Sequence, residues 1–237
     1  MELDNPVWYA LSETHSRYKV EFGNIKFYQS DYCPFGAFEN EIGIADGIDR
    51  YSKLCNNFFV VGNKPSFSNR IQLLNELVCN QMIIDQRIDL ISHEKIVELG
   101  DDHSKDLFDL VNLVQPGYFR PKTRLLGDYY GIFQKNKLVA LTGERMKMNQ
   151  YTEVSAVVTH PDFVGRGFAK QLVAHSVNKI FDQGKLPFLH VTESNVAAIG
   201  LYEKLGFRTR RKISFWKRQF TLFCNGRITT EWQGPEY

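Results

Sequence analysis

The sequence lacks the features that mark several classes of protein. It has four cysteines among 237 residues, none in a C-x-x-C pair, which favours reduced structural thiols over a metal centre or a disulfide framework. No stretch approaches the roughly 20 apolar residues that a membrane span needs. The first residues carry acids where a signal peptide has a basic region, and no apolar run follows them. We therefore expect a soluble, cytoplasmic protein.

The sequence also lacks a large excess of charge of either sign. The net charge is +2, so no global field favours nucleic acid or an anionic membrane as a partner. One segment, "RTRRKISFWKR" at residues 208–218, alternates basic and apolar side chains. It could be a nucleic-acid stripe, but a basic solvent face on an edge strand accounts for it better. With 43% hydrophobic residues, the chain has enough apolar surface for one large domain or two small ones.

Residues 1–90 read as a mixed α+β region without an evident catalytic group. Helical spacing relates Trp8 to Leu11, His15 and Tyr18, and "KVEFGNIKFY" predicts a hairpin that turns at residues 23–24. The runs "NNFFVVG" and "CNQMII" predict buried strands, and "NRIQLLNELV" at residues 69–78 predicts a helix between them. This region could be a degenerate half of the architecture that follows or a cover that sets specificity.

Residues 91–237 show a more regular alternation of elements. Strands are predicted near residues 94–99, 128–134, 137–148, 151–160, 186–193 and 208–216, and helices near 101–114, 164–181 and 195–205. The order β-α-β-β-β-α-β-α-β predicts an α/β (α+β) fold, in which helices flank a mixed, mainly antiparallel sheet. We therefore expect two regions, residues 1–90 and 91–237.

A glycine-rich loop stands where a predicted strand ends and a helix begins. In "VGRGFA", residues 164–169, the free amides of the first helical turn and the helix dipole form an anion site, which glycine leaves open. The loop lacks the Gly-Lys-Ser/Thr ending of a Walker loop, and Lys170 stands where a dinucleotide fingerprint has its third glycine. On its own, the loop could equally be a helix cap without a ligand.

With its flanks, the segment resembles the GNAT superfamily of acyl-CoA-dependent N-acyltransferases. The loop matches the family pattern Q/R-x-x-G-x-G/A at Gly167 and Ala169, with Val164 in place of the usual polar residue. A second stretch, "NVAAIGLYEKLGF", matches the pattern N-x-x-A-x-x-L-Y-x-x-x-G-F over residues 195–207. The resemblance covers residues 92–218, and phrases such as "PGYFRPKTRLLGDYYGIF" point to a subgroup with an extra N-terminal region. It implies acetyl-CoA, or another short acyl-CoA, as co-substrate and no metal.

The resemblance also implies roles for particular residues. Tyr202 matches the family's general acid, which protonates the leaving thiolate. A main-chain amide between Val157 and Thr159 would stabilise the developing oxyanion. A basic residue of the 208–218 segment, or Arg166 or Lys170, would meet the 3′-phosphate of CoA. The residues predicted to contact CoA are Val157, Thr159, Val164, Gly165, Arg166, Gly167, Phe168, Ala169, Lys170 and Asn195.

Glu153 is the leading candidate for a general base. Strand alternation places it on one face with Ser155, Val157 and Thr159, and its position matches that of the glutamate base in several family members. If it is buried, its pKa should be raised, which suits a base that works through water. The alternative is a solvated glutamate. Glu144 and His190 are further candidates, although His190 reads better as a hydrogen-bonded core histidine.

Two connecting segments complete the set of candidates. His160 and Pro161 are predicted to shape the turn into the glycine loop. Arg120, Lys122 and Arg124 lie in a connector that lines the acceptor side in this family; they could bind an anionic acceptor or belong to a solvated loop.

We therefore predict an N-acetyltransferase that moves an acetyl group, or another short acyl group, from acyl-CoA to a primary amine. The alternative is a catalytically silent acyl-CoA-binding regulatory module, which would need neither Glu153 nor Tyr202. The acceptor is left open among small amines, amino acids, peptides and proteins, and so is a homodimer. The need for a base depends on that acceptor, because an α-amine is far more often neutral at pH 7 than a lysine-like amine.

Overall fold

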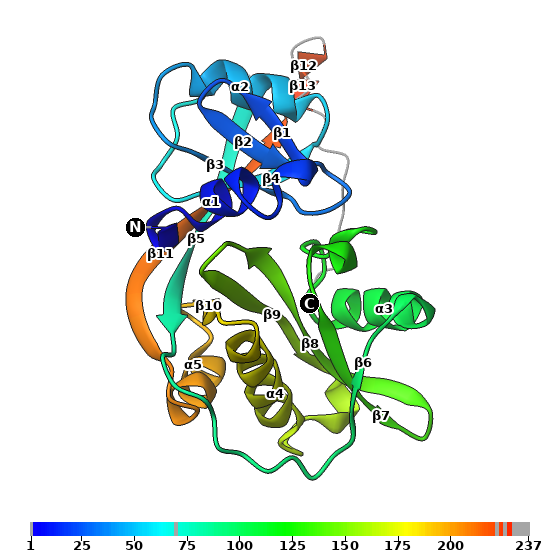
Figure 1. The fold of residues 1–237 in the computed structure, drawn as a ribbon. Helices are drawn as coiled ribbons and strands as arrows, with labels where there is room; N and C mark the ends of the chain where they lie inside the picture. Colours follow the sequence, from blue (N-terminus) through cyan, green and yellow to red (C-terminus); the bar gives the residue numbers. More distant parts are fainter. Residues whose placement is uncertain (1, 69–70, 221–222, 225–226, 229–237) are drawn as a thin grey trace.

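The centre of the fold is one long sheet that runs through both halves of the chain (Figure 1). The computed structural model describes residues 2–68, 71–220, 223–224 and 227–228. The sheet has eleven strands in the order β1-β2-β3-β4-β11-β5-β10-β9-β8-β7-β6. Only β3–β4 and β9–β10 pair in parallel. The strands are β1 Lys19–Phe22, β2 Ile25–Tyr28, β3 Phe35–Phe38, β4 Asn57–Val61, β5 Ile71–Ile83, β6 Ile96–Glu98, β7 Tyr129–Gln134, β8 Lys137–Lys147, β9 Tyr151–Thr159, β10 Leu186–Thr192 and β11 Arg208–Phe220, with a separate pair, β12 Phe223–Cys224 and β13 Arg227–Ile228.

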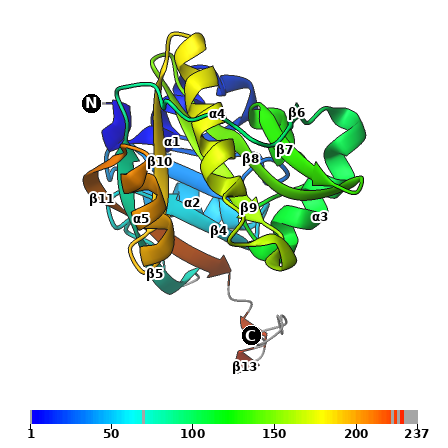
Figure 2. The same ribbon diagram turned by 90° about the horizontal axis from the view of Figure 1, so that it is seen from below.

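Helices cover both faces of this sheet. They are α1 Pro6–Ser12, α2 Ile44–Ser52, α3 Ser104–Val114, α4 Phe168–Asp182 and α5 Val196–Lys204, with short 3-10 turns at Glu2–Asp4, Ser16–Tyr18, Asp101–His103, Thr123–Leu126 and Pro161–Phe163. Helices α4 and α5 lie beside each other (Figures 1 and 2) and share a core with Val154 and Leu189. Helix α3 packs against Leu141 and Val158 on the other face. The mixed sheet flanked by helices confirms the predicted fold class.

The predicted meander of the C-terminal half is confirmed. Strands β7, β8 and β9 pair antiparallel in chain order. Lys135 and Asn136 form the turn between β7 and β8, and both have positive φ, 50° and 64°. A two-residue hairpin turn needs this left-handed geometry to match the twist of its strands. The predicted hairpin at residues 23–24 is confirmed as well, by the pairing of β1 with β2.

The helix predicted at residues 69–78 is wrong, because the described part of that segment is strand β5. The strand pairs with β11 from Ile71 to Ile83, and its C-terminal half also pairs with β10. The five apolar residues of this segment satisfy a helical period and a strand period almost equally well in so short a run. Hydrogen bonds to strands more than 100 residues away decide the conformation.

The sequence predicts an edge strand for the basic segment near the C-terminus; in the sheet this segment belongs to the interior strand β11, although residues 208–213 pair with β5 alone. Strand β11 lies between β5 and β4, and from Phe215 to Gln219 it pairs on both sides. Four of its basic side chains are paired with acids: Arg208 with Asp85, Arg210 and Arg211 with Asp4, and Lys212 with Glu193. The guanidinium of Arg218 instead lies 4.0 Å from the centre of the Phe67 ring.

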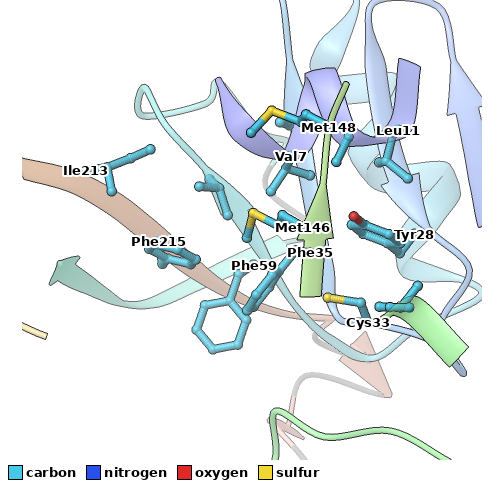
Figure 3. Packing of buried hydrophobic residues seen from close by; sticks show 14 of the residues in the cluster. Val7, Leu11, Tyr28, Cys33, Phe35, Phe59, Met146, Met148, Ile213 and Phe215 are labelled. Atoms are coloured by element: carbon cyan, nitrogen blue, oxygen red, sulfur yellow. The ribbon is translucent and has the colours of Figure 1, made fainter. Parts of the chain in front are cut away.

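One hydrophobic cluster joins distant parts of the chain (Figure 3). Val7 and Leu11 of α1 pack with Met146 of β8, with Met148 just after that strand, and with Phe215 of β11. In Figure 1, β5 and β11 run from the N-terminal elements to the C-terminal helices. The sheet therefore crosses the boundary predicted between residues 90 and 91 without a break, and that boundary stays a prediction.

The described helices include none with the length and apolar character that crossing a membrane requires.

Candidate active site

A cavity opens where strands β9 and β10 separate. Their parallel pairing ends at Glu153 and Phe188; beyond these residues β10 pairs only with β5, and β9 only with β8. The cavity has a volume of about 290 Å³. Four groups of residues line it: Val154, Ser155, Ala156 and Val157 of β9; His190, Val191 and Thr192 of β10; Asn195, Ala198 and Tyr202 at α5; and Phe35, Leu77, Cys79, Gln115, Tyr118, Arg145 and Phe215 from other elements.

A β-bulge shapes the β9 wall of this cavity. Ala156 has a φ of 49°, which is rare for a residue with a side chain, and the pairing with β8 skips a position between Leu141 and Gly143. After the bulge, Val157 packs with the core under α4 and α5, whereas Val158 packs with the core under α3. The prediction that Glu153 and Val157 share a face is therefore wrong, because the extra residue reverses the alternation.

The start of α5 forms the opposite wall. The side chain of Asn195 caps the helix, its Oδ1 accepting a hydrogen bond from the amide of Ala198 at 3.1 Å. Asn195, Ala198 and Tyr202 all line the cavity, as their spacing of three and four residues places them on one face of the helix. The ring of Tyr202 is 7% exposed and packs edge-on against Phe207. Burial raises the pKa of Tyr202 to about 12, so the phenol keeps its proton at neutral pH.

Glu153 lies beneath the cavity in a buried ion pair. Arg145 donates from Nε and Nη2 to the two carboxylate oxygens, at 2.8 and 2.7 Å, and Nδ1 of His190 lies 2.8 Å from Oε1. Burial by itself raises the pKa of Glu153, but the charge of Arg145 and the hydrogen bonds from His190 and Arg145 outweigh it and hold the pKa at about 2. The expected burial is present, and the expected raised pKa is wrong. The alternative of a solvated glutamate is wrong too.

His190 is hydrogen-bonded at both ring nitrogens. Its Nε2 lies 3.2 Å from the side-chain nitrogen Nε2 of Gln81. The side-chain oxygen of the same glutamine, Oε1, accepts a hydrogen bond from Arg210, which fixes the orientation of the amide. The Gln81 nitrogen can only donate, so Nε2 of His190 accepts and Nδ1 carries the proton that is donated to Glu153. A hydrogen-bonded core histidine is the interpretation that the sequence favoured for this residue.

Arg145 is the site residue that sequence reasoning missed. Its guanidinium lines the cavity and stacks 4.6 Å from the ring of Phe35. The sequence did contain a signal for it: Arg145 and Glu153 lie in the apolar runs of two successive predicted strands, where opposite charges can pair. Only the register of β8 with β9 shows that the two side chains meet.

The remaining charged candidates lie outside this cavity. Glu144 is buried and pairs with Lys147 at 2.6 Å. In the predicted acceptor-side connector, Arg120 donates to the carbonyl of Asn57 at 3.1 Å, while Lys122 pairs with Asp31 at 3.2 Å and Arg124 with Asp101. None of these side chains belongs to the described lining of the cavity.

The glycine loop has the open backbone that the sequence predicts. Gly165 and Gly167 have φ of 80° and 75°, and no atom lies within 4 Å of the place where a Cβ would stand. Gly167 is the N-cap of α4, so the first-turn amides of Phe168, Ala169 and Lys170 have no intrahelical partner. His160 supports the turn before the loop by accepting a hydrogen bond from the amide of Asp162, as predicted.

The loop side chains differ in what they could offer a ligand. Val164 is exposed, and the guanidinium of Arg166 stacks 4.7 Å from the ring of Phe163. The side chain of Phe168 is buried in the core between α4 and β8, so only its backbone can reach a ligand. Among the residues predicted to bind CoA, Val157 and Asn195 line the cavity, whereas Thr159 pairs with Ala140 outside it. Their binding roles stay predictions.

Comparisons with known proteins show which family this chain belongs to. The family model described as FR47-like protein matches residues 129–216. Among solved structures, a putative acetyltransferase from the GNAT family of Novosphingobium aromaticivorans is 30% identical, with a TM-score of 0.84 over 94% of this chain and 100% of that one. This sheet, split between two parallel strands and flanked by helices, is thus an acetyltransferase-type fold. The chain belongs to the GNAT family.

Curated relatives match a shorter part of the chain. An acetyltransferase from Yersinia enterocolitica is 46% identical over 61 residues, which is 25% of this chain and 43% of that protein. A ribosomal protein bS18-alanine N-acetyltransferase from Salmonella typhimurium is 40% identical over 52 residues, which is 22% of this chain and 35% of that protein. This chain therefore spans less than half the length of these two relatives.

Proposed function

We propose that the protein is an N-acetyltransferase that moves an acetyl group from acetyl-CoA to a primary amine. The observation that carries the proposal is the cavity between β9 and β10. Its lining combines Val154 and Val157, which belong to the core under α4 and α5, with Phe215, which belongs to the core around α1. Because residues of both faces meet in one cavity, two substrates can approach each other from opposite sides of the sheet.

The residues present fit an acyl-CoA on the α4–α5 side. The open glycines and the free amides at the start of α4 suit the pyrophosphate, because backbone amides there can donate without a Cβ in the way. Residues 164–170 would hold it, and Arg166 and Lys170 are the nearby cations for the 3′-phosphate. The exposed Val164 leaves the backbone of the loop as the source of these contacts.

When bound, acetyl-CoA supplies a thioester whose acyl carbon forms a bond to the amine nitrogen while the carbon–sulfur bond breaks. Tyr202 is protonated at neutral pH and lines the cavity, so we assign it the proton that the departing sulfur takes up. The backbone amides at the bulge, around Val157, are the donors for the acyl oxygen. The attacking nitrogen loses its proton to water.

Glu153 takes a different role from the one that its position first indicated. A carboxylate whose pKa is held at about 2 by an arginine is a weak proton acceptor at neutral pH. We propose that Glu153 is a positioning residue, which fixes Arg145 on one side and His190 on the other. If it were instead the base, the rate of Glu153→Gln relative to wild type should fall most steeply at low pH.

A thiol-release assay tests the function. Wild-type protein is mixed with acetyl-CoA and a panel of amines that includes α-amines, alkyl amines and polyamines, and free CoA is measured. We expect release that depends on one class of acceptor. Acetyl-CoA binding without release in any arm would indicate the silent binding module, and the absence of both would refute the proposal. The alanine named for the Salmonella relative is a reason to include α-amines.

A further inference from the structure

Apart from Gln115, His190 and Arg145, the acceptor side of the cavity is lined by apolar and aromatic side chains, several of them from the N-terminal region. Phe35 comes from β3, Leu77 and Cys79 from β5, and Phe215 from β11, while Tyr118 closes the wall from the connector after α3. None of the described residues that line the cavity is an aspartate or a glutamate. A wall of this kind favours an apolar acceptor body and offers no counter-charge for a second cation of the acceptor.

Arg145 adds one hydrogen-bond donor to this apolar wall. Nε and Nη2 are used by Glu153, whereas Nη1 has no hydrogen-bond partner among the described residues. The side chain of Arg145 is 15% exposed, and Glu153 compensates its charge. The cavity can therefore bind a carbonyl oxygen of the acceptor without burying an unpaired charge, and Nη1 can also donate a charge-assisted hydrogen bond to a carboxylate oxygen.

Among the described residues that form the site, neither Glu153 nor His190 is a free base for a strongly basic amine. Both oxygens of Glu153 accept hydrogen bonds from Arg145, and both nitrogens of His190 are engaged. A lysine-like amine with a pKa near 10.4 is neutral only about once in 2,500 at pH 7, whereas an α-amine near 7.8 is neutral about once in seven. A cavity that does not remove this proton itself suits the weaker base.

We propose that the acceptor is an α-amino group on an apolar body, whose neighbouring carbonyl or carboxylate oxygen is bound by Nη1 of Arg145. This inference rests on the proposed N-acetyltransferase function and names its substrate class. The N-terminal residue of a peptide carries all of this chemistry, whereas a free apolar amino acid carries the same oxygen and body with a more basic amine. The aromatic wall then selects the side chain, and the N-terminal region acts as the cover that sets specificity.

Four acceptors separate these possibilities in the thiol-release assay: L-phenylalanine, L-phenylalaninamide, phenethylamine and spermidine. Rates are expressed per neutral amine, so that differences in amine pKa are removed. We expect kcat/KM to be about tenfold or more higher for phenylalaninamide or phenylalanine than for phenethylamine, which lacks the oxygen, because a hydrogen bond to a charged donor is worth roughly 1.5–3 kcal/mol. Faster reaction of the free acid indicates amino acids, and faster reaction of the amide indicates peptide N-termini.

Arg145→Lys identifies the group responsible. Lysine keeps the charge opposite Glu153 but lacks the second arm of the guanidinium, so we expect the preference over phenethylamine to shrink to about threefold or less. Arg87→Lys is the matched control, because Arg87 is exposed and pairs with Asp182 away from the cavity. The control should keep the full preference.

The outcomes distinguish this inference from the function on which it rests. A higher rate with spermidine or phenethylamine would overturn the α-amine assignment and leave the acetyltransferase function standing. An unchanged preference in Arg145→Lys would overturn the role of Arg145. No release with any acceptor, in protein that also fails to bind acetyl-CoA, would overturn the function itself. If Arg145→Lys does not fold, the wild-type panel still decides the substrate class.

Discussion

The phenol of Tyr202 lies among apolar side chains of α4 and β10, and this environment fixes its protonation state. With a pKa of about 12, it is protonated across the whole range in which an enzyme assay is practical. A proton donor of this kind gives no acidic or basic limb of its own in a pH–rate profile below pH 10. Any limb seen there reports the acceptor amine or another group.

Tyr202→Phe tests the proposed general acid. The variant keeps the ring and its packing against Phe207 but loses the proton, so we expect kcat to fall about 100-fold with little change in the KM for acetyl-CoA. Steady-state kinetics with the best acceptor of the panel provide the measurement. An unchanged kcat would remove Tyr202 from the mechanism.

The Arg145–Glu153 pair makes a second prediction at this scale, for stability. Breaking a buried ion pair leaves one charge unpaired, so Arg145→Gln and Glu153→Gln should each lower the free energy of unfolding by about 3–5 kcal/mol. The double variant leaves neither charge unpaired, so its loss in free energy of unfolding should be smaller than the sum of the losses in the two single variants. Urea unfolding at pH 7 measures all three, and strict additivity would contradict the pairing.

The same pair predicts how stability depends on pH. The pKa of Glu153 is about 2 in the folded protein and near its ordinary value of 4.5 in the unfolded chain. The contribution of Glu153 to the free energy of unfolding is therefore complete above pH 4.5. It is lost as the pH falls towards 2, which lowers the free energy of unfolding by roughly 3 kcal/mol. Glu153→Gln should lack this part of the acid destabilisation, and an equal decline in both proteins would contradict it.

At the scale of elements, the loop before α4 has a backbone conformation that favours glycine. Alanine at Gly165 or Gly167 would have to adopt φ near 75–80°, which costs about 1 kcal/mol, and its methyl group would occupy the open space over the loop. We expect a modest loss of stability together with a loss of acetyl-CoA affinity of about tenfold or more. Calorimetric titration with CoA measures the affinity.

Gly184→Ala is the matched control for this prediction. Gly184 follows the C-terminal end of the same helix, with φ of 71° and no atom within 4 Å of an added Cβ. It should lose similar stability and keep full CoA affinity. Equal loss of affinity in all three variants would mean that the loop variants act through stability alone, and would remove the loop as the pyrophosphate site.

At the scale of the whole molecule, β5 holds the two halves together. This strand lies between β10 and β11. A fragment that begins at residue 91 lacks β5, so β10 and β11 would each lose a hydrogen-bonded neighbour. It would also lose Val7 and Leu11 from the core that contains Met146. We expect residues 91–237 alone to show no cooperative unfolding transition.

Circular dichroism of the fragment during thermal unfolding tests this, with the full chain as control. The full chain should unfold in a single transition, because the sheet and its main core span the predicted boundary. A cooperative transition of the fragment would show that residues 91–237 form an independent domain and that residues 1–90 are an appended cover.

Much of this protein follows from the sequence alone. The strand–helix order after residue 91, the turn at Lys135 and Asn136, and the shared face of Asn195, Ala198 and Tyr202 all follow from periodicity and turn chemistry, which act over a few residues. The same local rules identify the glycine loop, because a positive φ before a helix favours glycine. The two motifs of the GNAT family are local as well.

Only the tertiary structure decided the rest, because it depends on pairing between distant segments. Residues 71–78 form a strand because β11 and β10 supply its hydrogen bonds, and β11 is central because β4 takes its other side. The bulge at Ala156 reverses the alternation after Glu153, and the register of β8 places Arg145 against that carboxylate. The sequence made Glu153 a candidate and left its burial open; the packing of the sheet buries it, and the ion pair with Arg145 across the β8–β9 hairpin lowers its pKa.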